Sequence, residues 1–92
     1  MILVSVYDTK ADTWSRPVVA DSKASAMRDF ATLVRNKDTL PGQHPEDFQL
    51  FNLLEFRSFG SDGYQFEKLL PSPEHLANGV DYAQVQSPKV EV

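Results

Sequence analysis

One apolar segment, residues 44–57, constrains the fold more than any other part of the chain. It holds three of the six phenylalanines and is followed by a turn signal and a second aromatic run, which predicts a long β-strand. Its apolar residues fall on both faces of that strand: Phe48, Leu50, Leu54 and Phe56 on one, Phe51 and Leu53 on the other. Because a strand with one solvated face alternates cleanly, the pattern predicts that Phe51 and Leu53 meet a chain tail or another subunit.

The chain of 92 residues is long enough for one small domain, since a chain of this length buries roughly 60–65% of its unfolded surface. Hydrophobic residues make up 41% of the chain and aromatic residues 11%, which indicates a globular protein. We expect a single α+β domain over residues 1–79 and a tail or partner-binding arm over residues 80–92.

The first part of the chain predicts a hairpin and then a helix. Residues 2–7 alternate as a buried strand, and residues 14–20 resume the apolar pattern after a polar turn. Pro17 cannot donate to a neighbouring strand, so the second strand lies at a sheet edge or a bulge. Asp21 or Ser22 offers an N-cap for a helix that extends to about residue 36. The apolar stripe expected to pack on the sheet comprises Met27, Phe30, Ala31 and Val34.

The second half predicts another hairpin. Residues 37–47 contain a proline–glycine breaker and are expected to form a loop ahead of the long strand. Turn-forming residues 58–63 separate that strand from a pairing strand over residues 64–69. Ser72, followed by a proline, suits the start of a short helix through residue 77.

Together these elements predict a four-stranded antiparallel sheet of ββαββ order, with the strands arranged 2-1-3-4 and the helix on one face. The other face is left open. Its apolar content predicts a homo-oligomer assembled through that face, with Phe51 and Leu53 in the interface.

The nearest approach to a reactive cluster is the His-Pro-Glu-Asp sequence of residues 44–47, with Asp8 and His75 elsewhere. Its spacing matches no metal-ligand motif, and its proline favours a rigid turn that orients the entry to the strand. The chain has neither a glycine-rich phosphate loop nor a nucleophile elbow. We therefore expect no catalytic, metal-binding or cofactor-binding residues, no cofactor and no enzymatic activity.

Two groups of residues are candidate contacts for nucleic acid. Lys10 and Arg16 flank Trp14 in the first hairpin, where the indole could stack on a base while the cations touch phosphates. Arg57 and Lys68 would lie near each other across the second hairpin and could extend this surface. In the alternative, Trp14 packs in the core and the cations are solvated. The net charge of −4 favours that alternative and argues against non-specific coating of a phosphate backbone.

The composition also bears on the compartment. The chain has no cysteine, so it can form neither disulfides nor thiolate metal sites, which fits a reducing environment. Its apolar start is too short for a signal peptide, and no run approaches the length of a membrane span. We expect a cytosolic protein that does not contact a membrane.

Several stretches carry a family resemblance. The most specific is the His-Pro-Glu-Asp-Phe-Gln-Leu-Phe sequence of residues 44–51. The others are Tyr7-Asp8 at the end of the first strand, Pro17 ahead of the helix, and residues 26–30 and 69–77. On these residues the chain resembles the small nonstructural proteins of single-stranded-DNA microviruses, the gokushovirus-type phages.

The resemblance implies a phage-encoded protein that is absent from the capsid and acts in the cytoplasm of the infected bacterium, in synthesis of the single-stranded genome. It supplies no catalytic residues. Two hypotheses follow. The protein binds single-stranded DNA through the residues named above, or it is a non-enzymatic adaptor that docks on a phage or host replication-initiation protein without contacting DNA.

Overall fold

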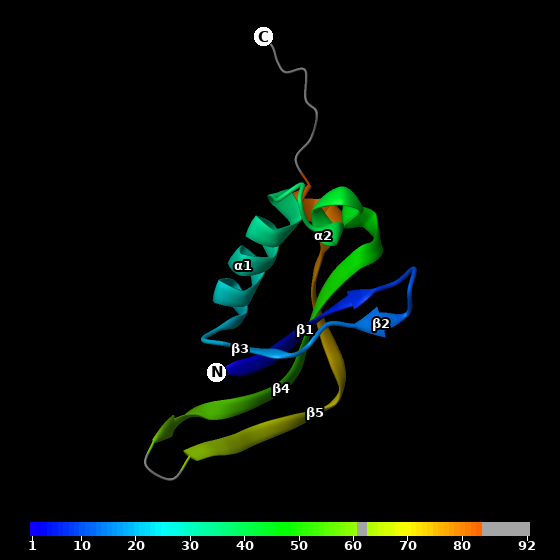
Figure 1. Ribbon diagram of the computed structural model, residues 1–92. Coiled ribbons are helices and arrows are strands. Elements are labelled where there is room, and N and C mark those ends of the chain that lie inside the picture. The colour runs from blue at the N-terminus through cyan, green and yellow to red at the C-terminus, as the bar shows by residue number, and fades with distance from the viewer. Residues whose placement is uncertain (61–62, 84–92) are drawn as a thin grey trace.

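The computed structural model describes residues 1–60 and 63–83, with side chains over residues 1–55 and 72–83. It has an α+β fold, in which a five-stranded antiparallel sheet carries one main helix (Figure 1). In chain order the elements are β1 (Ile2–Asp8), β2 (Thr13–Trp14), β3 (Val18–Ala20), α1 (Lys23–Arg35), α2 (Leu40–Gln43), the 3₁₀ segment η1 (Pro45–Asp47), β4 (Phe48–Gly60), β5 (Gly63–Asn78) and the 3₁₀ segment η2 (Gly79–Tyr82).

The α+β class and the antiparallel sheet are confirmed, but the strand count differs from the prediction. The strand expected over residues 14–20 is two short strands, β2 and β3, which both pair with β1. Between them, Ser15 replaces regular pairing: its Oγ accepts from Val6 N at 2.9 Å, and its carbonyl accepts from Ser5 Oγ at 2.8 Å. Pro17 lies in the same interruption, where its missing N–H costs no ladder bond. The sheet order is therefore β2-β1-β4-β5, with β3 also beside β1.

Helix α1 covers one face of the sheet, and the core lies between them (Figure 1). The Ser22 N-cap is confirmed, since its Oγ accepts from Ser25 N at 3.0 Å. The helix buries Ala26, Phe30, Ala31 and Val34. The sheet contributes Ile2, Val4, Phe48, Leu50 and Ala77 to the same core. Because Val4 lies on this face, its neighbours Leu3 and Ser5 lie on the opposite one, which we call the helix-free face.

The loop expected over residues 37–47 is more ordered than predicted, because it contains α2 and η1. Thr39 caps α2 by accepting from Gly42 N at 3.0 Å. Gly42 is required by close approach, since a Cβ there would lie 1.8 Å from the Asn36 carbonyl oxygen. The proline–glycine pair thus forms a tight helical turn against the end of α1.

The prediction of a short helix over residues 72–77 is wrong. β5 continues through this segment, and its ladder with β4 pairs Leu50 with Ala77 and Phe51 with His75. Pairing with β4 outweighs the local helix-start signal of Ser72 and its proline. The turn between the two strands is also shorter than the predicted range of residues 58–63, since β4 reaches Gly60 and β5 starts at Gly63.

The described chain ends beside α1. The ring of Tyr82 packs edge-on against that of Phe30, with 6.1 Å between centroids, and Ala83 also contacts the core. The division between a domain over 1–79 and a tail over 80–92 stays a prediction, and residues 84–92 lie outside the described part. None of the described helices is both long and apolar enough to cross a membrane.

Candidate nucleic-acid interface

Four rings, one from each of four neighbouring strands, form a row on the helix-free face. We call it the aromatic row: Trp14 of β2, Tyr7 of β1, Phe51 of β4 and His75 of β5. Ring centroids are separated by 4.7 Å for Trp14–Tyr7, 5.2 Å for Trp14–Phe51 and 5.4 Å for Phe51–His75. The planes are tilted or edge-on, a geometry that adds about 0.5–1.5 kcal/mol per pair beyond burial.

The sheet register creates this row. Tyr7 lies opposite Trp14, and Phe51 lies opposite Ser5 on one side and His75 on the other. Opposed residues of antiparallel strands share a face. Residues far apart in the chain are therefore brought side by side.

The ends of the row are more accessible than its centre. Trp14 is 46% exposed, and His75 is also exposed. Tyr7 and Phe51, in the middle, are half-buried. The Phe51 ring packs against its neighbours and fixes a platform whose outer rings can accept a stacking partner.

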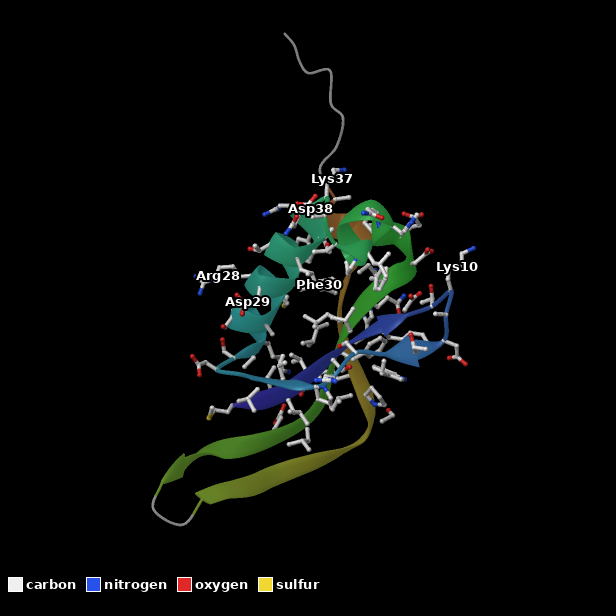
Figure 2. The ribbon with its side chains drawn as sticks, viewed as in Figure 1. Lys10, Arg28, Asp29, Phe30, Lys37 and Asp38 are labelled. Atoms are coloured by element: carbon white, nitrogen blue, oxygen red, sulfur yellow. The ribbon has the colours of Figure 1, made fainter. Side chains whose placement is uncertain are left out.

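Two predicted cations lie close in sequence to Trp14, and both are exposed. Lys10 is at the tip of the β1–β2 turn, on the side of the molecule away from α1 (Figure 2). Asp8 shapes this turn, because its Oδ1 accepts from Lys10 N at 3.0 Å and Ala11 N at 3.1 Å. Arg16 directly follows β2 in the interruption before β3.

The other predicted cations are not opposite each other. In the β4–β5 ladder Arg57 pairs with Gln65, and Lys68 pairs with Glu55. Arg57 lies past the last β1–β4 pair and Lys68 lies opposite Glu55 at that last pair, whereas Lys10 and Arg16 lie near β2. Their ladder pairs are separated by the Phe56–Phe66 pair, and the described geometry does not join them to the aromatic row.

An acidic group borders the row. Tyr7 Oη donates a hydrogen bond to Asp12 Oδ1, and this bond, reinforced by the negative charge of Asp12, raises the pKa of the Tyr7 phenol above its ordinary value. Asp12 has a left-handed φ of 55°, which Asp tolerates in turns. The carboxylates of Asp8 and Asp12 reduce the positive potential beside Lys10.

The predicted interface residues Phe51 and Leu53 have neighbours within the chain. Phe51 is at the centre of the aromatic row, so part of its apolar surface is covered without another subunit. Leu53 is half-buried at a register shift, where Leu3 pairs with Leu54 and Val4 pairs with Asn52. The bulge at Leu53 explains why strict alternation along β4 fails there.

The His-Pro-Glu-Asp sequence forms the turn that enters β4. Potential ligand atoms of His44, Glu46 and Asp47 lie within 4.8 Å of one another, so these three side chains are a group that could approach a metal ion. His44 and Glu46 are exposed. The Asp47 carbonyl accepts from Thr9 N at 2.8 Å and Thr9 Oγ1 at 3.0 Å, which ties the turn to the end of β1.

Sequence reasoning singled out Trp14 for DNA but not Tyr7 or His75. The alternation along β1 contained a usable signal, since Tyr7 has the opposite parity to the buried Val4. No local signal pointed to His75, because it reaches the row only through the β4–β5 register.

The fold and this surface define a small α+β domain with one helix-covered sheet face and one aromatic face. Residues 1–82 match the family described as Phage ORF5 protein, and the chain belongs to this family. No curated protein and no solved structure matches the chain. The phage affiliation expected from the resemblance is thus confirmed at the level of a phage protein family.

Proposed function

We propose that the protein binds single-stranded DNA through the aromatic row and acts in genome synthesis of a single-stranded-DNA phage of the microvirus type. It would do so in the host bacterial cytoplasm and without catalysis. The observation that carries the proposal is the row itself, which spans four strands and ends in a 46%-exposed Trp14. Membership of a phage protein family supports the biological setting.

Stacking is the larger contribution to binding on this surface. A base on an aromatic side chain contributes about 1–3 kcal/mol and requires no particular sequence. A single strand exposes its bases, whereas a duplex buries them in its own stack. A group of partly exposed rings on an open sheet face therefore suits single strands.

Electrostatics contribute less. The net charge is −4, and Lys10 and Arg16 are the two cations close to Trp14 in sequence. Two phosphate contacts correspond to a slope of log K against log salt of about −1.4 for a single strand. A fourfold rise in salt should therefore weaken binding by only about sevenfold.

The test is a titration of a labelled single-stranded oligonucleotide, followed by fluorescence anisotropy at two salt concentrations. Trp14→Ala should lower the affinity by about tenfold or more, and Arg16→Ala should lower it less and flatten the salt dependence. Arg28→Ala is the matched control, because Arg28 is on the exposed side of α1 (Figure 2). Absence of binding at low salt, or binding that neither Trp14→Ala nor Arg16→Ala weakens, would refute the proposal.

An apolar groove favours a second candidate function, that of an adaptor for a replication-initiation protein. The groove has a volume of about 450 Å³ and runs between the β2–β3 segment and α2. Val18 and Leu40 line it, with 58% and 61% of their surface exposed. Leu40→Asp should then impair phage genome synthesis while leaving oligonucleotide binding intact. Because Trp14 also lines the groove, Leu40→Asp rather than Trp14→Ala separates the two candidate functions.

A further inference from the structure

The hairpin of β4 and β5 extends past the rest of the sheet. β1 pairs with β4 only as far as Glu55, so the remaining residues of the two strands pair with each other alone. We call residues 54–60 and 63–69 the arm; its first two β4 residues, 54 and 55, still pair with β1, whereas residues 56–60 do not. Figure 1 shows the arm extending away from α1 and α2. A two-stranded hairpin by itself is at best marginally stable in water, so the arm requires a further layer.

The ladder makes the arm amphipathic. Phe56 pairs with Phe66 and Leu54 with Leu69, which places four apolar residues at positions of one face. Phe66 and Leu69 are three residues apart on β5, a spacing that would place them on opposite faces of a regular strand. The register shift between Glu55 and Phe56 adds one residue on β5 and so returns the two pairs to the same face. We call them the arm apolar face. The paired positions of the other face up to Arg57 are polar: Glu55, Arg57, Gln65 and Lys68.

The arm apolar face continues the helix-free face of the sheet. Leu54 pairs with Leu3, whose parity along β1 is that of Tyr7 in the aromatic row. α1 packs on the opposite face. The helix that protects the core therefore cannot also protect the arm.

We propose that a second copy of this chain covers the arm apolar face, so that two arms stack face to face in a symmetric homodimer. A twofold axis suits this surface, because each copy offers the same two apolar pairs to the other. Two stacked sheets lie about 10 Å apart with their inner side chains interdigitated. Four phenylalanines would bury roughly 600–1,000 Å². With the leucines added, the interface reaches the area of about 1,000 Å² or more that a specific one requires.

Other occupants fit less well. Adding a strand to the outer edge of β5 is disfavoured next to the arm, where Pro71 and Pro73 lack the required N–H donors. The polar face carries charges of both signs, which gives no preference for an acidic or a basic partner. The last described residues of the chain pack beside α1, at the end of the molecule opposite the arm (Figure 1).

Sedimentation equilibrium of the full chain tests the dimer directly. The wild type should have twice its chain mass of 10.4 kDa at micromolar concentrations. Phe66→Glu should weaken dimerisation at least tenfold, whereas Gln65→Glu, the neighbouring position on the polar face, should leave it unchanged. A monomeric wild type at about 100 µM would overturn the inference, as would equal effects of the two variants.

Cysteine cross-linking gives an answer even if Phe66→Glu fails to fold. The chain has no cysteine of its own, so each introduced thiol reports alone. With a thiol-specific cross-linker about 10 Å long, the spacing of stacked sheets, Phe56→Cys should form a cross-linked dimer, and Arg57→Cys on the other face should not. Equal yields for the two variants, or no cross-link for either, would contradict the face-to-face arrangement. Neither experiment involves DNA, so the dimer can fail while the proposed function holds.

Discussion

The ring of Trp14 lies against the ring of Tyr7, with 4.7 Å between centroids and 41° between planes. The two residues are directly opposed in the β1–β2 ladder, so this contact follows from the register of a two-residue strand. Trp14 is the only tryptophan in the chain. Its fluorescence therefore reports on this end of the aromatic row and on nothing else.

Removing the centre of the row should cost more stability than removing its end. Phe51 contacts the rings of Tyr7, Trp14 and His75. We expect Phe51→Ala to lower the free energy of unfolding by about 2–3 kcal/mol, below the range for a fully buried phenylalanine because the side chain is half-buried. Urea denaturation followed by circular dichroism measures this loss. His75→Ala is the control and should cost less than about 1 kcal/mol, and equal costs would argue against a packed row.

The Tyr7 phenol should ionise at higher pH than an ordinary tyrosine. Its hydrogen bond to Asp12 favours the neutral phenol, which raises its pKa. The associated stability is complete below the ordinary pKa and is lost as pH rises through the raised one. In Asp12→Asn the pKa should fall, because the acceptor loses its charge while the side chain still suits the φ of 55°. An ultraviolet titration of the tyrosines, with Tyr7→Phe subtracted, checks this. Identical curves for Asp12→Asn and wild type would contradict it.

Gly79 should not tolerate even a methyl group. A Cβ at this position would lie 2.4 Å from the carbonyl oxygen of Pro45 and 3.0 Å from that of Phe48. These are backbone atoms and cannot move aside without shifting η1. We expect Gly79→Ala to destabilise the protein by about 1–3 kcal/mol in thermal or urea unfolding. An unfolding midpoint of Gly79→Ala equal to that of the wild type would show that η1 and η2 are not packed as described.

The stability of the protein should be sensitive to a negative charge at position 52. Asn52 is fully buried, and its Nδ2 donates to Glu74 Oε1 at 3.0 Å, with Glu55 Oε2 at 3.5 Å. Asn52→Asp would place a third carboxyl group beside two others, so burial and charge would raise its pKa. The variant should be near wild-type stability below about pH 4 and lose about 3–5 kcal/mol as pH rises through that pKa. Unfolding midpoints across this pH range test the prediction.

The matched control for Asn52→Asp is Asn78→Asp. Asn78 is half-buried at the end of β5, where its Oδ1 is 2.8 Å from His75 Nε2. A carboxylate there keeps an acceptor for the ring nitrogen. We expect little change in stability at neutral pH, and a loss as large as that of Asn52→Asp would mean that burial at residue 52 is not the cause.

The elements with strong local signals were predicted correctly. The helix over residues 23–35 follows from its N-cap at Ser22 and from its apolar stripe. The long strand β4 follows from its concentration of aromatic and aliphatic residues ahead of a turn signal. The segment over residues 72–77 was missed, because a serine–proline pair suits the first turn of a helix and an edge strand alike. Only the partner strand β4 distinguishes the two.

Local patterns were thus enough for the class of the fold, for the helix and for the exposed cations of the first hairpin. They were not enough for the candidate site. Trp14, Tyr7, Phe51 and His75 come from four strands, and the β1 and β4 registers that unite them include a bulge. A shift of one residue turns a side chain to the opposite face of a sheet. For that reason only the folded sheet decides which aromatic side chains form a surface and which form the core.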